Sequence, residues 1–502
     1  MHRAINRQTD QAMIPVYRQI YERFRDAIAS GVLKPGDRMP SMRALTKELG
    51  VARGTVEAAY GLLSAEGYIQ ARGQAGTVVT PDLALPAAQP GRSPAGQAAA
   101  SPDSGLPVSK SGVREAGGDG TAGGLPSAAP VPLTLDGDTW GGVLPFQMGL
   151  PALDAFPRKV WARLGARCVR AMQAADMAYP ISNGIPPLRT AIAAYLQVSR
   201  GIACSPAQVF VTTGYRHTLA LIVRALLARG DPVWLEDPGY PPTRELIAQA
   251  QLRGVAVPVD ADGLDVAQGL KLAPDARAVV VTPSHQSPLC LSLTLPRRLA
   301  LLDWASRAQA WIIEDDYDGE YRYASRPLPA LKSLDRDGRV LYAGTFSKVL
   351  FPSVRLAYLV VPEDQVERFT QTSLAFSGGA PNLMQSLVAA FMAEGHFARH
   401  IQRMRKLYKE RREIAAEALA DVLDRHFQID PQPGGMHLVL RLRGQLPDAP
   451  LARRMREHGM AGHALTQWGI ARDPGAALLL NFTNIDSSDT ARRLGRRILD
   501  LL

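Results

Sequence analysis

A lysine that follows two hydroxyl side chains is the first feature of the sequence with an evident chemistry. Residues 344–348 read Gly-Thr-Phe-Ser-Lys, so Lys348 stands just after Thr345 and Ser347. A lysine amine in such a turn can form a Schiff base with an aldehyde. The two hydroxyls and Arg355, seven residues further on, can bind a phosphate. We therefore expect Lys348 to be the catalytic residue, although a single lysine could also be a solvated surface charge.

A carboxylate at the end of another apolar run indicates which aldehyde is bound. Residues 312–317 read Ile-Ile-Glu-Asp-Asp-Tyr. A pyridine ring accepts electrons only when its nitrogen is protonated, and an aspartate opposite that nitrogen keeps the proton there. We assign this role to Asp315 and expect Tyr317 to donate to the ring oxygen. Paired aspartates could also bind a metal, but no further ligands have suitable spacing. The expected cofactor is pyridoxal 5'-phosphate, with no metal.

Two more strand ends supply groups for the same site. The residues Gly214, Tyr215 and Arg216 join a predicted strand to a predicted helix, whose first backbone amides form an anion site suited to phosphate. Residues 236–240 end the next predicted strand with Tyr240, which can stack on the cofactor ring. Core packing remains the alternative for Tyr240.

The elements that must position these groups form an α/β domain. Its predicted strands are short, β-branched or aromatic, and apolar on both faces, which is typical of a buried, largely parallel sheet. They are residues 209–212, 232–235, 278–282, 310–314 and 339–343. Stretches such as 218–228 and 297–307 are predicted crossover helices. A sheet of this kind presents ligand groups on loops at the carboxyl ends of its strands.

The first 80 residues predict a smaller domain of three helices and a hairpin. The first helix carries Val16, Ile20, Phe24 and Ile28 on one face. A second helix begins after Ser41, which caps it. A third spans residues 53–66, and residues 68–71 and 77–80 alternate like two strands.

Composition sets the boundaries between these parts. The chain has 502 residues, enough for two or three domains. Residues 81–139 are dense in Pro, Gly, Ala and Ser and cannot bury enough apolar surface to fold, so we predict a linker between domains at 1–80 and 140–502. The net charge of +10 does not by itself distinguish a DNA-binding surface from an ordinary soluble one. We expect a cytoplasmic, reduced protein, because no signal or membrane segment is evident and the three cysteines fit no zinc or disulfide pattern.

The N-terminal part resembles a GntR-type winged helix-turn-helix. The resemblance rests on residues 34–43, Lys-Pro-Gly-Asp-Arg-Met-Pro-Ser-Met-Arg, and on residues 49–56, Leu-Gly-Val-Ala-Arg-Gly-Thr-Val. It implies that the third helix enters the major groove of DNA and that the hairpin tip approaches the backbone. The expected DNA-binding residues are Arg43, Arg53, Gly54, Thr55 and Gly76. One departure is Ala52, which replaces a Ser or Thr cap and removes about 1 kcal/mol of local helix stability.

The remainder resembles the fold type I, pyridoxal phosphate-dependent aminotransferases. Joined to a GntR-type module, it is similar to the MocR subfamily of regulators. The resemblance implies that Tyr179 reaches the phosphate of a neighbouring subunit and that His285 lies near the ring oxygen. It also implies a head-to-tail, domain-swapped homodimer.

Three residues depart from that family. Cys290 replaces a glycine in the loop at 285–290, and we expect the turn to change because cysteine tolerates a positive φ poorly. Leu479 stands where aminotransferases carry an arginine for the substrate carboxylate. Pro242 stands where a relative that senses γ-aminobutyrate has an arginine. Arg216 or Arg472 could supply the missing cation.

These observations favour a DNA-binding transcription regulator that senses pyridoxal phosphate, an amine or an amino acid through aldimine chemistry. We expect weak or no turnover, because a site without a carboxylate clamp positions an amino acid loosely. The main alternative is an active aminotransferase with an accessory DNA-binding module. A third is a binding module without covalent cofactor chemistry. The expected partners are double-stranded DNA, a small-molecule effector and a second copy of the chain, with no membrane.

Overall fold

A computed structural model of the chain describes residues 16–29, 33–49, 51–65, 68–71, 76–80, 142–323, 329–376, 378–430 and 434–502. The linker predicted at 81–139 lies outside the described residues. No helix in the described ranges is both long enough and apolar enough to cross a membrane.

The N-terminal module has the three helices and the hairpin that the sequence predicts. They are α1 (Val16–Ala29), α2 (Met42–Leu49), α3 (Arg53–Ala65) and the antiparallel strands β1 (Ile69–Ala71) and β2 (Thr77–Val79). Ser41 caps α2, because its Oγ accepts the backbone N–H of Ala44 at 3.1 Å. Ile20, Phe24 and Ile28 are buried as expected. Val16 is exposed instead, because it is the first residue of the helix.

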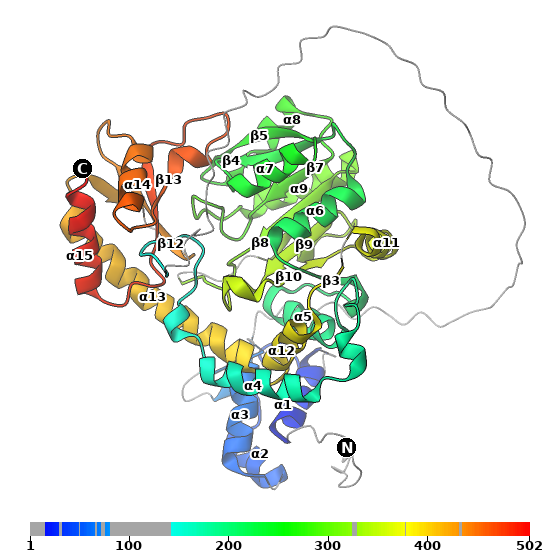
Figure 1. Cartoon of the computed structure of the whole chain (residues 1–502). Helices are drawn as coiled ribbons and strands as arrows, with labels where there is room; N and C mark the ends of the chain where they lie inside the picture. The colour runs from blue at the N-terminus through cyan, green and yellow to red at the C-terminus, as the bar shows by residue number, and fades with distance from the viewer. Residues whose placement is uncertain are drawn as a thin grey trace, which may run out of the picture.

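The large domain is built around an eight-stranded sheet in the order β3-β10-β9-β8-β7-β4-β5-β6 (Figure 1). Its strands are β3 (Val209–Thr212), β4 (Pro232–Asp237), β5 (Arg253–Asp260), β6 (Gly263–Leu264), β7 (Ala278–Val281), β8 (Trp311–Asp316), β9 (Val340–Thr345) and β10 (Ala357–Val360). The strands β5, β4, β7, β8 and β9 are parallel, whereas β10 is antiparallel to both of its neighbours. The predicted buried, largely parallel sheet is therefore confirmed. The sequence interpretation had not assigned β5, β6 or β10.

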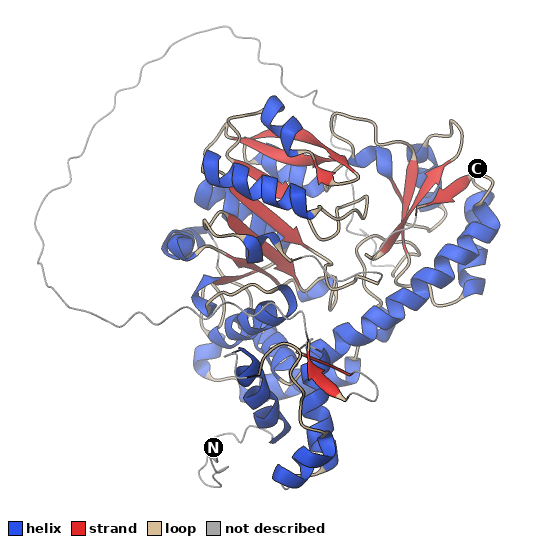
Figure 2. Cartoon of the chain, turned by 180° about the vertical axis from the view of Figure 1, so that it is seen from behind, coloured by secondary structure: helices blue, strands red, loops and turns tan. Residues whose placement is uncertain are grey.

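Helices cover this sheet and connect its strands (Figure 2). They include α6 (Tyr215–Leu226), α7 (Pro241–Gln249), α8 (Val266–Leu272), α9 (Leu295–Ala308), α10 (Leu331–Leu334) and α11 (Val366–Phe376). The helix α6 begins three residues earlier than predicted, directly after Gly214, whose φ of +125° favours glycine. The early start places the first turn of α6 at the carboxyl edge of the sheet.

The C-terminal part folds as a smaller sheet with helices against it. Its strands β11 (Phe427–Ile429), β12 (His437–Leu442), β14 (Ala477–Asn481) and β13 (His463–Ala464) pair in that order. The helices α14 (Asp448–Glu457) and α15 (Ser488–Leu499) belong to this part. The long helix α13 (His396–Leu423) packs against α15 and runs from this sheet toward the N-terminal module (Figure 1).

The N-terminal module rests on the end of the large domain near α13. A group of helices forms this end: α4 (Arg158–Ala171), α5 (Pro186–Arg200) and α12 (Asn382–Ala393). The helix α3 contacts α13, and Val198 of α5 packs against the hydrophobic core of the module. The module and the large domain are thus in direct contact through side chains.

Candidate functional site

The predicted lysine and aspartate lie at the same edge of the sheet. Strands β8 and β9 are parallel neighbours in which Asp315 stands opposite Ala343. Lys348 follows β9 by three residues, and its Nζ donates to the carbonyl of Gly149 at 3.0 Å. The lysine charge also reaches Asp315, since it lowers the pKa of that carboxyl against the other influences on it. The two residues therefore lie at the same edge of the sheet, near enough for their charges to interact.

Asp315 is a buried carboxyl that lacks a hydrogen-bond donor. Only 7% of the residue is exposed, and no hydrogen bond to its side chain is formed by the described parts of the chain. Burial raises the pKa of Asp315 well above its ordinary value, and the nearby Asp316 and Glu236 carboxyls raise it further. A buried acceptor without a donor is costly. A protonated pyridine nitrogen would supply the missing donor, so this residue fits pyridoxal phosphate.

A histidine and a tyrosine stand beside Asp315. His285 is buried, and its Nδ1 lies 3.1 Å from both Asp318 Oδ2 and Tyr317 Oη. Burial disfavours the charged imidazole, but the Asp318 carboxylate outweighs it and raises the pKa of His285 well above its usual value. The other ring nitrogen, Nε2, is buried without a partner among the described residues. A protonated His285 Nε2 could donate a hydrogen bond to an anionic oxygen on the ring of pyridoxal phosphate.

The start of α6 forms the part of the site suited to a phosphate. Gly214 precedes the helix, and a Cβ added there would lie 3.6 Å from the guanidinium of Arg355. Arg355 forms no side-chain hydrogen bond or ion pair with the described residues. Backbone amides at a helix start and an unpaired guanidinium together form an anion site. Thr345 lies at the same edge, where its Oγ1 accepts the N–H of Ser347 at 3.1 Å.

Two tyrosines line a small cavity behind Asp315. Tyr215 donates to or accepts from Thr243 Oγ1 at 2.6 Å, and its ring lies 5.7 Å edge-on from that of Tyr240. Both line the cavity together with Asp315 and Glu236. Burial raises the pKa of Glu236 to about 7, although three hydrogen bonds from Thr282 and Gln286 oppose this shift. The cavity therefore has two carboxyls that hold protons unusually well.

Two predicted cofactor residues lie apart from this group. The guanidinium of Arg216 pairs with Glu245 at 3.1 Å on the surface, so only its backbone amide belongs to the start of α6. Tyr179 follows the short helix η3 (Ala174–Met177) and is 98% exposed. Its side chain is therefore open to solvent and is not packed into the site of its own chain.

The loop at 285–290 places Cys290 at a positive φ of +62°, a conformation that cysteine tolerates poorly. The expected change of turn relative to the family stays a prediction. The hydrogen bonds Gln286 N–H to Leu291 O at 2.6 Å and Cys290 N–H to Gln286 O at 2.7 Å close the turn and hold this conformation. The thiol lies 3.2 Å from His437 Nε2. Burial raises the pKa of Cys290, but the two imidazoles of His285 and His437 outweigh it and lower the value to about 6.

Leu479 occupies an apolar part of the site. It is fully buried in a cluster with Cys290, Val439, Leu465, Trp468 and Ala477. Pro242 lies in the first turn of α7, and Arg244 of the same helix donates to the carbonyl of Gly469 at 3.0 Å while lining the cavity. Two buried histidines adjoin this cluster, because His463 pairs with Leu479 across the sheet and His437 contacts the thiol of Cys290.

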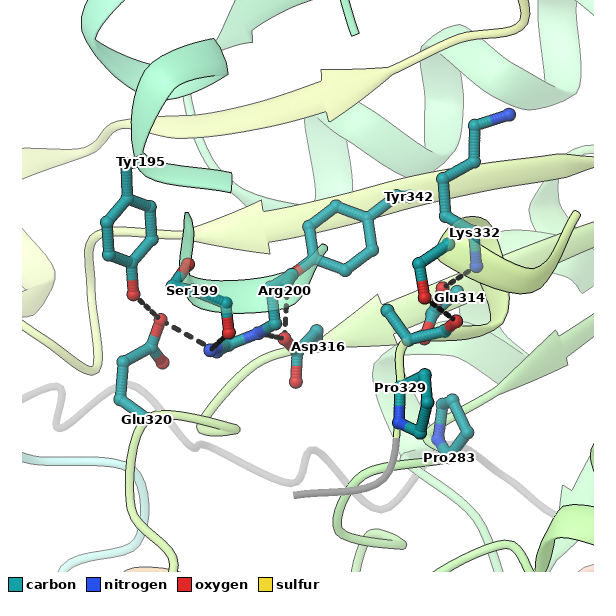
Figure 3. Close-up of polar contacts among 12 residues, drawn as sticks. Tyr195, Ser199, Arg200, Pro283, Glu314, Asp316, Glu320, Pro329, Lys332 and Tyr342 are labelled. Carbon is teal, nitrogen blue, oxygen red and sulfur yellow. Dashed lines mark hydrogen bonds and ion pairs between the residues drawn. The ribbon is translucent and has the colours of Figure 1, made fainter. Parts of the chain in front are cut away.

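A buried ionic network on the other side of β8 was missed by the sequence interpretation (Figure 3). Arg200 at the end of α5 pairs with Asp316 at 2.5 Å and with Glu320 at 2.9 Å. Tyr342 donates to Asp316 at 2.5 Å, and Tyr195 donates to Glu320 at 2.8 Å. The second aspartate of the pair at 315–316 was visible in the sequence, but its distant partners were not. The network ties α5 to the strand that presents Asp315.

The predicted DNA-binding residues lie on one small module. Arg53 begins α3, is mostly exposed and forms an ion pair with Glu57 at 2.8 Å. Gly54 is exposed beside it, and the N–H of Thr55 donates to the Ala52 carbonyl at 3.0 Å. Gly76 has a φ of +84° just before β2. Arg43 falls on α2, but its side chain lies outside what the structure describes.

Comparisons with known proteins match both parts of the chain. Residues 16–79 match the model of the bacterial regulatory proteins, gntR family, and residues 146–485 match that of aminotransferase class I and II. The chain is 36% identical over 476 residues to the probable rhizopine catabolism regulatory protein MocR of Rhizobium meliloti, covering 95% of this chain and 91% of the relative. It is 33% identical to the pyridoxine biosynthesis transcriptional regulator PdxR of Corynebacterium glutamicum, covering 84% and 82%.

A solved structure extends the likeness of the large domain. LysN, the alpha-aminoadipate aminotransferase of Thermus thermophilus, superimposes with a TM-score of 0.65 and 28% identity, over 72% of this chain and 93% of that one. That crystal structure holds N-(5'-phosphopyridoxyl)-L-leucine. The large domain therefore has the type I aminotransferase fold, whose family depends on pyridoxal phosphate.

Proposed function

The chain belongs to the MocR subfamily of GntR-type transcription regulators, and on this premise we propose that it binds pyridoxal phosphate at Lys348 and couples that site to DNA binding. The proposed domains are a DNA-binding domain at 1–80, a linker at 81–139 and a cofactor-binding effector domain at 140–502. The observation that carries the proposal is the donor-free, buried Asp315 within reach of the Lys348 charge.

Each side chain of the site has a separate task in this proposal. Lys348 presents its amine, and Asp315 keeps a proton on the ring nitrogen. Arg355, Thr345, Ser347 and the amides of residues 214–216 hold the phosphate. His285 and Tyr317 bind the ring oxygen, and Tyr240 packs on the ring. When bound, pyridoxal phosphate supplies an aldehyde that condenses reversibly with primary amines.

The effector is either pyridoxal phosphate itself or an amine that reacts with it. Two relatives are named as regulators of pyridoxine biosynthesis and of rhizopine catabolism, so regulators similar to this chain serve more than one pathway. DNA is bound by the first turn of α3, with Arg53, Gly54 and Thr55, aided by Arg43 and by the hairpin at Gly76. The contact of Val198 with the module core supports a mechanical link between the two parts.

We also propose a homodimer in which Tyr179 completes the partner's site. The support is a set of exposed apolar side chains, unusual on a monomer surface, that includes Met177, Tyr179, Ile181 and Leu374. Ser373, at the end of α11, donates to the Ser182 carbonyl at 2.9 Å, so the two segments that carry these side chains lie together.

The visible spectrum of the purified protein tests the cofactor site. Wild type mixed with pyridoxal phosphate should show the absorbance of the lysine-bound cofactor, and Lys348→Ala should not. Lys271→Ala, which changes an exposed lysine of α8, is the matched control and should behave like wild type. Equal spectra for wild type and Lys348→Ala would overturn the assignment of Lys348.

DNA binding tests the coupling. Footprinting on the DNA upstream of the protein's own gene, with and without pyridoxal phosphate, should show a change in affinity or in the protected pattern. A coupling free energy between two sites is typically about 1–3 kcal/mol, or roughly 5- to 150-fold in affinity. An identical footprint in both conditions would overturn the proposed coupling, because DNA binding would then not depend on the cofactor.

A further inference from the structure

One helix of the large domain has a strongly one-sided charge. The helix α4 has the sequence RKVWARLGARCVRA, with five basic residues and no acidic one. The net charge of α4 is therefore +5, whereas that of the entire chain is +10. Such a concentration repels itself unless an anion lies nearby. Neither the cofactor site nor the recognition helix uses these residues.

Most of this charge lies on one face and lacks a partner. Lys159, Arg163, Arg167 and Arg170 follow one another at intervals of four, four and three residues, which places them on the same side of a helix. All four are exposed. Glu394 neutralises Arg167 through an ion pair. The other three form no ion pair with any residue that the structure describes.

The face continues onto the first half of α13. Arg403 and Lys406 lie three residues apart on α13, are exposed and form no ion pair within the described ranges. The junction is close, because the charges of Arg163 and of Arg399 on α13 both act on His396 and lower its pKa together with burial, the largest cause. We call Lys159, Arg163, Arg170, Arg403 and Lys406 the α4–α13 basic face.

This face lies at the end of the large domain that meets the DNA-binding module. The recognition helix α3 contacts α13 itself, and the neighbouring helix α5 touches the module core through Val198. Figure 1 shows α4 at the same end of the domain, where it packs beside α12. Part of the basic face therefore lies on α13, the helix that α3 contacts.

We propose that the α4–α13 basic face is a second DNA-contacting surface, which binds backbone phosphates flanking the site read by α3. The inference rests on the proposed DNA binding by the module and extends it to the effector domain. Unpaired lysine and arginine side chains match a phosphate backbone, and such contacts add affinity without reading sequence. Contacts from the effector domain would also give changes at the cofactor site a direct effect on bound DNA.

The experiment compares two triple variants of the full-length protein. One neutralises the face with Lys159→Gln, Arg163→Gln and Arg170→Gln. The control removes the same charge from exposed arginines of α14 and α15, far from the module, with Arg453→Gln, Arg454→Gln and Arg496→Gln. Fluorescence anisotropy then follows binding to mixed-sequence duplexes of about 15 and about 60 base pairs over a range of salt concentrations.

The face variant should bind the long duplex roughly tenfold or more weakly than the control variant. Its salt slope should fall by about 3, because each lost phosphate contact removes about 0.9. Binding to the short duplex should be the same for both variants. Equal affinity of the two variants for the long duplex would overturn the inference while leaving DNA binding by the module intact.

Two further outcomes also decide against it. If sedimentation shows that only the face variant changes its oligomeric state, the face is a contact between copies of the chain. Circular dichroism checks that the wild-type protein is folded. If folded wild type binds neither duplex, the proposed DNA binding fails and the inference fails with it. An Arg53→Ala variant separates the two surfaces, since it should weaken binding to the short duplex as well.

Discussion

Asp315 and Glu236 are two buried carboxyl groups of the same cavity that differ in their hydrogen bonds. Asp315 has no donor of its own, whereas Glu236 accepts the backbone N–H and the hydroxyl of Thr282 at 3.2 and 2.6 Å. Burial nevertheless raises the pKa of both. Asp315 therefore keeps an unsatisfied carboxyl, as the proposed contact with a ring nitrogen requires, whereas Glu236 is held by hydrogen bonds.

Glu236 makes stability depend on pH in a defined direction. Its pKa of about 7 exceeds the ordinary 4.5, so the folded chain binds the proton more tightly than the unfolded chain. Its stabilising contribution is complete below pH 4.5 and is lost as the pH rises through about 7, by about 3 kcal/mol. The variant Glu236→Gln, which does not titrate, should therefore gain stability relative to wild type between about pH 5 and about pH 8.

Thermal unfolding at about pH 5 and about pH 8 measures the difference in stability between Glu236→Gln and wild type. The exposed carboxyl of Glu457 on α14 provides the control, and Glu457→Gln should differ from wild type by the same amount at both pH values. A pH-independent difference between Glu236→Gln and wild type would show that burial does not control this carboxyl.

At the scale of elements, α5 connects the two functional parts of the chain. Its last residue, Arg200, binds Asp316 at the end of β8 and Glu320 in the segment that follows, and Val198 packs on the DNA-binding module. The arginine and both carboxylates are almost completely buried. Removing one member of a buried ionic group leaves the others uncompensated, which is costly.

Replacing Arg200 should therefore destabilise the large domain strongly. We expect Arg200→Met to lower the free energy of unfolding by roughly 3–5 kcal/mol. The control is Arg216→Met, which removes the mostly exposed pair with Glu245 and should cost less than about 1 kcal/mol. Urea unfolding followed by tryptophan fluorescence compares them. Equal midpoints for the two variants would mean that the buried network contributes no more than a surface pair.

How much of the site could be predicted depended on how local each signal is. The sequence placed Lys348 and Asp315 at one edge of the sheet because each stands at the end of its own apolar run, and parallel strands bring those ends together. Arg200 and Asp316 are 116 residues apart, and Lys348 and its Gly149 acceptor are 199 apart. No short sequence motif contains both members of such a pair, so the sequence did not predict these contacts. The strand β10 has only four residues, and its antiparallel pairing with β3 and β9 was not apparent from its pattern.

At the scale of the whole molecule, exposed apolar residues form the surface on which we propose that a second chain docks. Met177, Ile181 and Leu374 are 70%, 49% and 61% exposed, around the fully exposed Tyr179. The N–H₂ of Asn382 donates to the Asp176 carbonyl at 3.1 Å, which fixes this segment on the surface of the large domain. A rigid apolar surface of this kind favours a stable dimer.

Charges placed on this surface should separate the dimer. The double variant Met177→Lys and Ile181→Lys should sediment as a monomer at concentrations where wild type is dimeric, because burying two unpaired lysines is unfavourable. Leu270→Lys and Leu272→Lys change exposed leucines elsewhere, on α8, and should leave the dimer intact. A dimer that survives the first pair of changes would place the interface on another surface.

The two sides of strand β8 carry carboxylates with different roles. Successive residues of a strand face opposite ways, so Asp315 addresses the cofactor site while Asp316 holds Arg200. Inserting or deleting one amino acid within β8 would exchange these two carboxylates between the sides in a single step. Such length changes should therefore be absent from functional descendants of this chain.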